Sequence, residues 1–321
     1  MKKYLLFFYF LHLSVSAQDK PEYKVEFIPK ELLKNADVVV RLQEEIFSVE
    51  NEGKATQKGK FVYTILNKDA NRYSVFIQNY DKLTEISALS GKLYNKNGNL
   101  ITKLKKSDAV DLNISDMNEV FDDRIKGLSF THNEYPYTVE FEYEILIKHL
   151  LFYPEFIPKQ LPNAAVQSCT FSLIVPSDNQ FYYKTYNTSV KPEIKEAKNK
   201  KKYTWLFRDL PTIHYETFSP NIRELIPHIS TSPNKFELEK YEGKMDTWGN
   251  LGVFMYKLNE GRSELPKKTK IKLQEMVSNA KDDYEKVQII YNYMQSKTRY
   301  VNIQLGIGGW QPLPSELVDT K

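Results

Sequence analysis

The stretch TVEFEYEILI, residues 138–147, decides the fold class of this chain. Apolar and acidic residues alternate along it without a break, and this period of two is typical of an antiparallel strand with one buried face. The apolar positions are Val139, Phe141, Tyr143, Ile145 and Ile147, and the acidic positions are Glu140, Glu142 and Glu144. The stretch therefore predicts a half-buried β-strand whose glutamates lie on the solvent-facing side.

Strand-like segments extend on both sides of this stretch, from about residue 22 to residue 215. VVVRLQEEIFSVE (38–50) and KGKFVYTILN (58–67) flank the turn-rich NEGKATQ, and together they predict a hairpin. The pair Asn97-Gly98 predicts a second tight turn, because both residues tolerate a positive φ. Many strands with short turns and no alternating helices predict a mainly β fold, an antiparallel sheet or sandwich.

The pattern changes to a helical one near residue 245. DTWGNLGVFMYKL (246–258) offers Asp246 as an N-cap and an apolar stripe at helical spacing: Trp248, Leu251, Phe254 and Leu258. LPKKTKIKLQEMVSNA (265–280) has a proline suited to a first turn. In DDYEKVQIIYNYMQSKT (282–298), Asp282 and Glu285 form an aspartate variant of the capping box. Its apolar stripe consists of Tyr284, Val287, Ile290, Tyr291 and Met294.

Residues 1–17 have the three parts of a signal peptide. Lys2 and Lys3 precede an apolar core that is too short to span a bilayer, and Val15-Ser16-Ala17 forms a small-residue cleavage site. No cysteine follows the apolar core, so we do not expect a lipid anchor. We expect an exported protein of the periplasm, the cell envelope or the extracellular space, without stable membrane insertion after cleavage.

Charge and composition give little indication of a partner. The formal net charge is +4, and two of these positive charges lie in the predicted signal peptide. The one basic run, KNKKK (198–202), lies between two strand-like segments, so it predicts a solvated hairpin tip and not a nucleic-acid surface.

The residues do not assemble a catalytic or metal site in the sequence. Cys169 is the single cysteine, so no disulfide can form within the chain, and its place in a strand pattern predicts a packed thiol. The histidines that follow the signal peptide are scattered, without zinc-ligand spacing. GIGG (306–309) lacks the lysine and the helix of a phosphate-binding loop. We therefore expect no metal and no cofactor.

Two parts of the chain resemble a known pair of domains. YNYMQSKTRYVNIQLGIGGWQPLPSELVDTK (291–321) resembles the entry to a transglutaminase-like domain of the papain-like cysteine hydrolase superfamily. ILNKDANRYSVFIQNYDKLTEISALSGKLYNKNGNLITKLKKSD (65–108) and YPYTVEFEYEI (135–145) resemble the β domain of unknown function that precedes this enzyme domain in exported bacterial proteins. The resemblance implies an antiparallel β domain over residues 18–240. It implies that residues 241–321 are the helical beginning of an incomplete α+β transglutaminase-like domain.

The resemblance also implies which chemistry the chain lacks. In that family a motif of the Gly-Asp-Cys type follows the Gly-rich turn, and a histidine and an aspartate come later. The chain ends at Lys321 before these positions, so we expect a fragment without a catalytic residue of its own; Cys169 lies too far upstream to be the nucleophile. Only Trp310 and Gln311 carry over, as residues that line the cleft near the nucleophile, where the amide of Gln311 could donate to an oxyanion. The alternative is that Trp310 is a core residue and Gln311 a turn residue.

Two hypotheses about function follow. In the first, the full-length form is a transglutaminase-like cysteine hydrolase or acyltransferase that acts on a peptide or amide of an unknown protein or peptide substrate. In the second, the chain is a non-catalytic β-sandwich module outside the cytoplasm, which serves as a scaffold or binds a glycan, peptide or protein. A Gly-Asp-Cys-like motif encoded after Lys321 would favour the first hypothesis, and a stop codon would favour the second. The sequence does not specify the substrate, hydrolysis versus cross-linking, or the oligomeric state.

Overall fold

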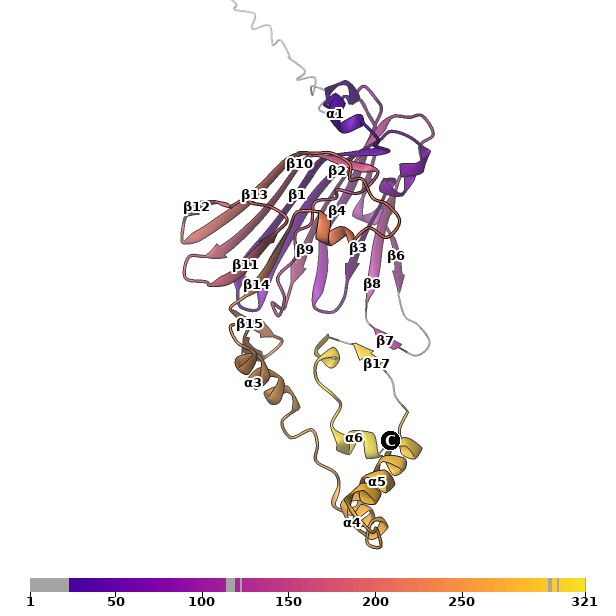
Figure 1. Cartoon of the computed structure of the whole chain (residues 1–321), viewed down its shortest axis with the longest axis vertical. Coiled ribbons are helices and arrows are strands. Elements are labelled where there is room, and N and C mark those ends of the chain that lie inside the picture. The colour runs from indigo at the N-terminus through magenta and orange to yellow at the C-terminus, as the bar shows by residue number, and fades with distance from the viewer. Residues whose placement is uncertain (1–22, 114–118, 122, 300–301, 305, 321) are drawn as a thin grey trace, which may run out of the picture.

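The computed structural model describes residues 23–113, 119–121, 123–299, 302–304 and 306–320. The predicted signal peptide lies outside these residues. The chain is mainly β, with its longer helices after the sheet region, as the sequence predicts. In Figure 1 the strands form the upper body and the longer helices lie below it.

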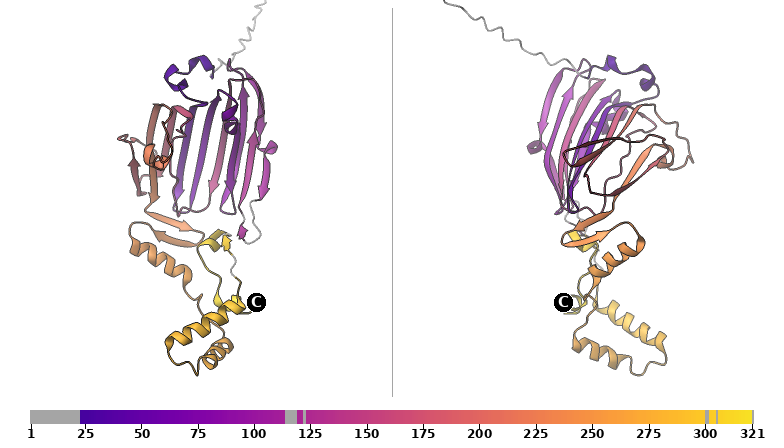
Figure 2. Two further views of the ribbon diagram at one scale, coloured as in Figure 1. Left: turned by 45° about the vertical axis from the view of Figure 1, so that its right-hand side comes forward. Right: turned by 90° about the vertical axis from the view of Figure 1, so that its left-hand side faces the viewer.

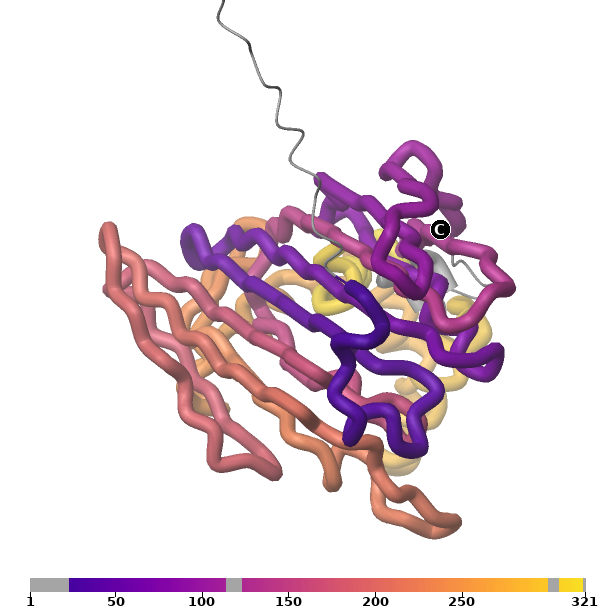
Figure 3. Tube along the Cα trace, turned by 90° about the horizontal axis from the view of Figure 1, so that it is seen from above, coloured from indigo at the N-terminus to yellow at the C-terminus, as the bar shows by residue number. Residues whose placement is uncertain are grey.

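One large sheet dominates the molecule, with eight strands in the order β12-β13-β10-β1-β2-β9-β4-β5. Figure 3 looks down on it, with β12 and β13 in salmon at one end of the row. The strands are β1 (Val38–Asn51), β2 (Lys54–Ile65), β4 (Thr84–Tyr94), β5 (Leu100–Lys105), β9 (Tyr137–Ile147), β10 (Ala164–Pro176), β12 (Glu193–Ala197) and β13 (Lys200–Leu210).

Smaller sheets accompany the large one. They are formed by β3 (Val75–Tyr80), β8 (Arg124–Ser129) and β6 (Val110–Asn113); by β11 (Phe181–Tyr186) and β14 (His228–Pro233); by β15 (Lys235–Leu238) and β16 (Tyr241–Lys244); and by β17 (Asn302–Gln304) and β7 (Glu119–Phe121). The first packs on β9 of the large sheet, where the ring of Phe76 stacks on Phe141 and Tyr143. The second packs on β13, where Tyr183 meets Trp205 edge to face.

Most strand pairs are antiparallel, as predicted, but β1 and β10 pair in parallel. Val38 lies beside Ala164 and Ser48 beside Ile174. The sequence does not reveal this pair, because no helical crossover separates the two strands and both have ordinary strand patterns. The large sheet is therefore mixed.

The alternation in β9 is confirmed on its apolar side, where Val139, Phe141, Tyr143 and Ile145 are buried. The prediction that all the glutamates face solvent is wrong for Glu140, whose side chain is 2% exposed. Lys60 and Lys92 both pair with its carboxylate. These cations, with hydrogen bonds to the charged form, lower the pKa of Glu140 although burial alone would raise it. Glu140, which belongs to the acidic row of β9, is thus covered by two neighbouring lysines.

The predicted hairpins are confirmed. β1 and β2 are joined across Glu52 and Gly53. Gly98 adopts a φ of 77° in the loop between β4 and β5. The basic run forms the tip between β12 and β13, where Lys198 and Asn199 have positive φ.

The first long helix, α3 (Trp248–Asn259), packs on the β15–β16 hairpin. Its N-cap is Thr247, whose hydroxyl accepts a hydrogen bond from the Asn250 amide; the expected cap, Asp246, instead bonds the Asn250 side chain. Phe254 and Leu258 are buried in the same core cluster as the sheet, but Trp248 is 89% exposed and does not belong to the buried stripe. The domain division at residue 240 stays a prediction.

The helices α4 (Lys267–Met276), α5 (Asp283–Lys297) and α6 (Ser315–Thr320) lie farther from the sheet (Figure 2). The short helical segments of the chain are α1 (Lys30–Leu33), α2 (Ile222–Leu225) and the 3₁₀ turns η1 (Val25–Phe27), η2 (Lys68–Ser74), η3 (Lys106–Asp108) and η4 (Gly306–Gly309). Asp282 caps α5 as predicted, by accepting from the Glu285 amide. The predicted apolar stripe of α5 is exposed. Among the described residues, no helix is both long enough and apolar enough to cross a membrane.

Candidate functional site

The segment that resembles the approach to a catalytic cysteine is anchored beside the sheet by Gln311. Its side-chain nitrogen donates to the hydroxyl of Tyr241 at 3.0 Å and to the carbonyl of Leu258 at 2.9 Å. Tyr241 belongs to the β15–β16 hairpin and Leu258 to α3, so one amide joins two elements that both pack against the sheet.

Neighbouring contacts fix the same segment. The ring of Trp310 lies 5.6 Å from that of Phe152, on the loop that follows β9. The amide of Ile307 donates to a carboxylate oxygen of Glu239 at 3.4 Å, and β17 pairs in parallel with β7. Trp310 remains 39% exposed, so it lies at the rim of this junction and not in the core. Trp310 and Gln311, the two residues named from the sequence, therefore both contact this junction.

The hydrogen bonds of Gln311 limit what its side chain can do in this arrangement. A glutamine amide has two N–H donors, and both are engaged here. Donation to an oxyanion would require one of these bonds to break. The bond to Tyr241 also lowers the pKa of that phenol, because a donor at the phenolic oxygen favours the phenolate. Gln311 acts in this structure as a tether.

The β15–β16 hairpin also forms one wall of a cleft of about 450 Å³. The other walls are Glu52 at the β1–β2 turn and the exposed side of α3. The apolar part of the lining comes from Phe236, Val253 and Phe254. Sequence reasoning missed this site, although KFELEKYEGK (235–244) carries a visible signal: charged residues occur at every second position, at 235, 237 and 239 and again at 240, 242 and 244.

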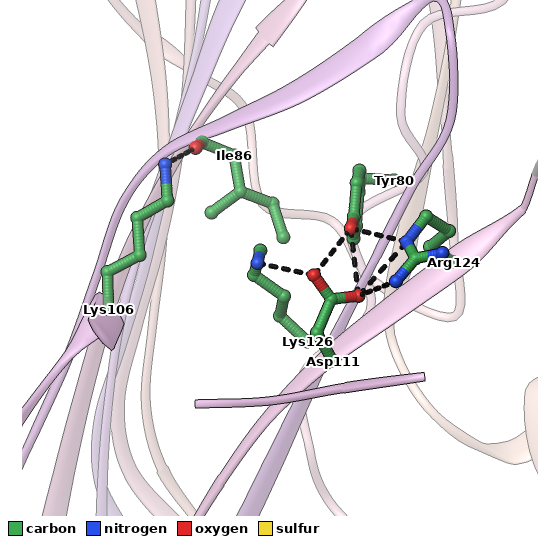
Figure 4. A network of polar contacts seen from close by, with 6 residues as sticks. All are labelled: Tyr80, Ile86, Lys106, Asp111, Arg124 and Lys126. Atoms are coloured by element: carbon green, nitrogen blue, oxygen red, sulfur yellow. Dashed lines mark hydrogen bonds and ion pairs between the residues drawn. The ribbon is translucent and has the colours of Figure 1, made fainter. Parts of the chain in front are cut away.

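A second polar cluster lies on the face of the β3–β8–β6 sheet where Tyr80 and Asp111 meet, shown in Figure 4. Asp111 accepts from the ammonium of Lys126 at 2.6 Å and from the guanidinium of Arg124 at 2.9 Å. The hydroxyl of Tyr80 donates to the same carboxylate at 2.8 Å. The bond from Lys126, followed by that from Tyr80, lowers the pKa of Asp111 to about 2. Each of these polar side chains has a hydrogen-bond or ion-pair partner within the cluster, so we interpret the cluster as a structural network.

Comparison with family models identifies the sheet region. The model of a domain of unknown function with solved structures, DUF3857, matches residues 51–214, which is about half of the chain. The chain belongs to the DUF3857 family. No curated protein matches this DUF3857 chain.

Solved structures extend the comparison beyond the DUF3857 region. A "putative protease" from Parabacteroides distasonis superposes with a TM-score of 0.61 at 18% identity; the match covers 86% of this chain and 53% of that one. The DUF3857 chain thus spans about half the length of that protein, and at this identity the likeness concerns the fold alone. An M1 zinc metallopeptidase from Deinococcus radiodurans (TM-score 0.30, 10% identity, covering 76% and 53%) is too distant to support an inference. The same holds for a "putative nutrient binding protein" from Legionella pneumophila (TM-score 0.29, 11% identity, covering 82% and 95%).

The single thiol of this DUF3857 chain is in an environment unsuited to a nucleophile. Cys169 is completely buried in β10, as the strand pattern predicts. Burial and, to a smaller extent, the nearby Glu45 carboxylate raise its pKa to about 12. No hydrogen bond in the described part of the chain joins Cys169 to a histidine. A thiol that stays protonated cannot attack a carbonyl.

Glu45 is a half-buried acid that the sequence analysis did not single out. It lies on the core-facing side of β1 and accepts from the side chain of Gln43 at 2.9 Å. Burial raises its pKa, and these hydrogen bonds oppose the shift only in part. Gln43 is itself tied to the backbone of Ile157 and Lys159, so it orients the acid. Within the described residues no group of His, Cys, Asp and Glu side chains could hold a metal ion.

Proposed function

We propose that this chain is the leading part of an exported transglutaminase-like cysteine hydrolase or acyltransferase. In this proposal the β15–β16 hairpin and α3, which follow the DUF3857 region, hold the segment that approaches the nucleophile. The resemblance of residues 291–321 to that segment motivates the proposal. The observation that carries it is the tether of Gln311 to Tyr241 and Leu258.

Through the tether, the β15–β16 hairpin and α3 would have a supporting role in catalysis. Catalytic groups must be held within about 0.5 Å of their productive positions, and sites supported by packed elements meet this demand better than free loops. In this chain the Gly-rich turn is held by the hairpin and by α3, through Glu239, Tyr241 and Leu258. A residue that follows this turn would inherit a fixed position relative to the sheet.

The proposed chemistry lies outside the residues of this chain. A cysteine thiolate would attack a peptide or amide carbonyl, and a histidine would accept and return the proton. This chain would position the segment that leads to the nucleophile and would exclude water from it. Trp310 lies at the rim of this junction, beside Phe152. The structural likeness to the protein from Parabacteroides distasonis supports a hydrolase-type architecture at the level of fold.

We also propose export, with cleavage after Ala17. The charged start, short apolar core and small residues at 15–17 support it. Amino-terminal sequencing of the protein from the cell envelope should then begin at Gln18. A mature protein that begins at Met1 would contradict export by this route.

A non-catalytic binding module is the second candidate. It is favoured by the absence, among the described residues, of an assembled nucleophile, base and orienting group. Such a module would bind a peptide or protein outside the cytoplasm without turnover.

One experiment separates the two. The coding sequence after Lys321 is read, and the full gene product is treated with a thiol-directed peptide electrophile. The enzyme proposal expects a Gly-Asp-Cys-like motif and covalent labelling at that cysteine. A natural stop after Lys321, or a product that lacks any labelled thiol, would favour the binding module.

A further inference from the structure

The cleft between the β15–β16 hairpin and α3 is lined by six charged side chains of both signs. Three are acids, Glu52, Glu237 and Glu242. Three are bases, Lys235, Lys244 and Lys257. Among the residues that the structure describes, none of the six takes part in an ion pair within 4.0 Å, although they share one cleft.

The register of the hairpin sorts these charges by sign. Lys235 lies directly opposite Lys244, and Glu237 lies directly opposite Glu242. The row of lysines and the row of glutamates lie on the same face, because the positions on each strand are two residues apart. Like charges directly opposite each other destabilise a strand pair. The hairpin therefore carries an arrangement that its own stability does not favour.

The large sheet of the same protein places opposite charges across from each other. On the outer face of β2 and β9, Lys58 lies opposite Glu144 and Lys60 opposite Glu142. Both of these pairs form ion pairs. The unpaired rows of the hairpin are thus a departure from the pattern that this chain uses elsewhere.

The acidic end of the cleft is built from two elements. The backbone amide of Glu237 donates to the carbonyl of Glu52 at 2.7 Å, which places the β1–β2 turn beside the hairpin. The carboxylate of Glu237 lies over Gly53, where a Cβ would come within 3.1 Å of its oxygen. A larger residue than glycine at position 53 would displace this carboxylate. The close approach therefore helps to hold the acidic group together.

We infer that this cleft binds a short peptide that carries a free ammonium and a free carboxylate group. The ammonium would be bound by the glutamate row and the carboxylate by the lysine row, through charge-assisted hydrogen bonds. The two rows are separated by two residues of extended strand, about 6.6 Å, and a dipeptide backbone spans the same length. Val253 of α3 also lines the cleft. This inference goes beyond the proposed enzyme function and does not depend on it, because binding here needs no nucleophile.

The test measures binding of glycyl-leucine to the full chain by isothermal titration calorimetry. N-acetylglycyl-leucine and glycyl-leucinamide each lack one charge, and free leucine carries both charges too close together. We expect glycyl-leucine to bind. Each of the other three should bind at least about tenfold more weakly, because it forgoes one charge-assisted hydrogen bond. Absence of binding by glycyl-leucine, or equal binding of the acetylated form, would overturn the inference; equal binding of free leucine would overturn the assignment to a peptide.

A charge-exchange variant supplies the matched control. E242K together with K244E keeps the composition and net charge but places opposite charges across from each other in both rows. We expect this variant to lose glycyl-leucine binding while its melting temperature stays the same or rises. E275Q, on the exposed side of α4, should bind as the parent does. Unchanged binding in the exchange variant would show that the sorted rows are not the recognition element.

Discussion

The side chain of Gln311 donates to the hydroxyl of Tyr241, a residue 70 positions earlier in the chain, at 3.0 Å. The same amide reaches the carbonyl of Leu258, so the end of the Gly-rich turn is tied to both the hairpin and α3. Gln311→Ala removes both bonds, each with a net contribution of about 0.5–1.5 kcal/mol. We expect the amides of residues 307–311 to exchange hydrogen faster in this variant, as measured by mass spectrometry. Gln274→Ala, at an exposed position of α4, is the control, and unchanged protection in Gln311→Ala would contradict the tether.

Two glycines near the cleft form a matched pair for stability. A Cβ on Gly243 would lie 2.3 Å from the ring of Phe236, whereas one on Gly252, in α3, would meet nothing within 4 Å. We expect Gly243→Ala to lower the free energy of unfolding by about 1–3 kcal/mol through overpacking. Gly252→Ala should raise it by about 0.5–1 kcal/mol, because alanine restricts the unfolded chain and favours the helix. Urea denaturation measures both, and equal effects of the two substitutions would refute the packing of Phe236 on Gly243.

The Asp111 cluster predicts a pH dependence of stability. Its pKa falls from 3.8 to about 2 on folding, so the ionised carboxylate stabilises the folded state above the ordinary pKa. This contribution is lost as the pH falls from about 4 towards 2. The free energy of unfolding of the parent minus that of Asp111→Asn should therefore be largest near neutral pH and shrink in acid. Asp178→Asn controls for the loss of one carboxylate, and a difference between parent and Asp111→Asn that grows in acid would contradict the direction of the shift.

Cys169 should be inert in the folded protein. Burial raises its pKa to about 12, so the thiolate is scarce at the pH of ordinary alkylation reactions. We expect iodoacetamide to leave the native chain unmodified and to add a single adduct after denaturation in urea. Intact-protein mass spectrometry measures both states, and rapid alkylation of the native protein would show that β10 opens or is misplaced.

The apolar stripe of α5 should drive self-association. Tyr284, Val287 and Tyr291 are 78%, 66% and 52% exposed, and exposed apolar surface of this kind favours association. Ile290→Glu, in the same stripe, should shift sedimentation equilibrium towards the monomer. Gln288→Glu adds the same charge on the exposed side of the helix outside the stripe and should change little. Equal association of the parent and both variants would exclude the stripe as the contact.

Much of the sheet follows from local patterns. The alternation in residues 138–147 predicts β9 and its buried row, and Asn97-Gly98 predicts the β4–β5 hairpin, because each depends on a few neighbouring residues. The parallel pairing of β1 with β10 is set by tertiary packing between segments far apart, so no local pattern indicates it. The burial of Glu140 depends on Lys60 and Lys92 from neighbouring strands, for the same reason.

The candidate sites were predictable only in part. The sequence singles out Trp310 and Gln311, but their partners Phe152, Tyr241 and Leu258 come from other parts of the chain. The resemblance implies an oxyanion role for the amide of Gln311, but the two bonds that occupy its donors are visible only in three dimensions. The sorted charges of the cleft depend on the hairpin register, which places Lys235 opposite Lys244 and not beside a glutamate.

The parallel pairing of β1 and β10 also sets an order of events during folding. Val38 cannot meet Ala164 until the intervening strands have been synthesised, so one edge of β1 stays open while the β1–β2 hairpin can already form. Closing so long a loop carries an entropy cost, and non-local pairings of this kind slow folding. The β1–β10 pairing therefore cannot form until residue 164 is available, whereas the β1–β2 hairpin can form as soon as residue 65 is.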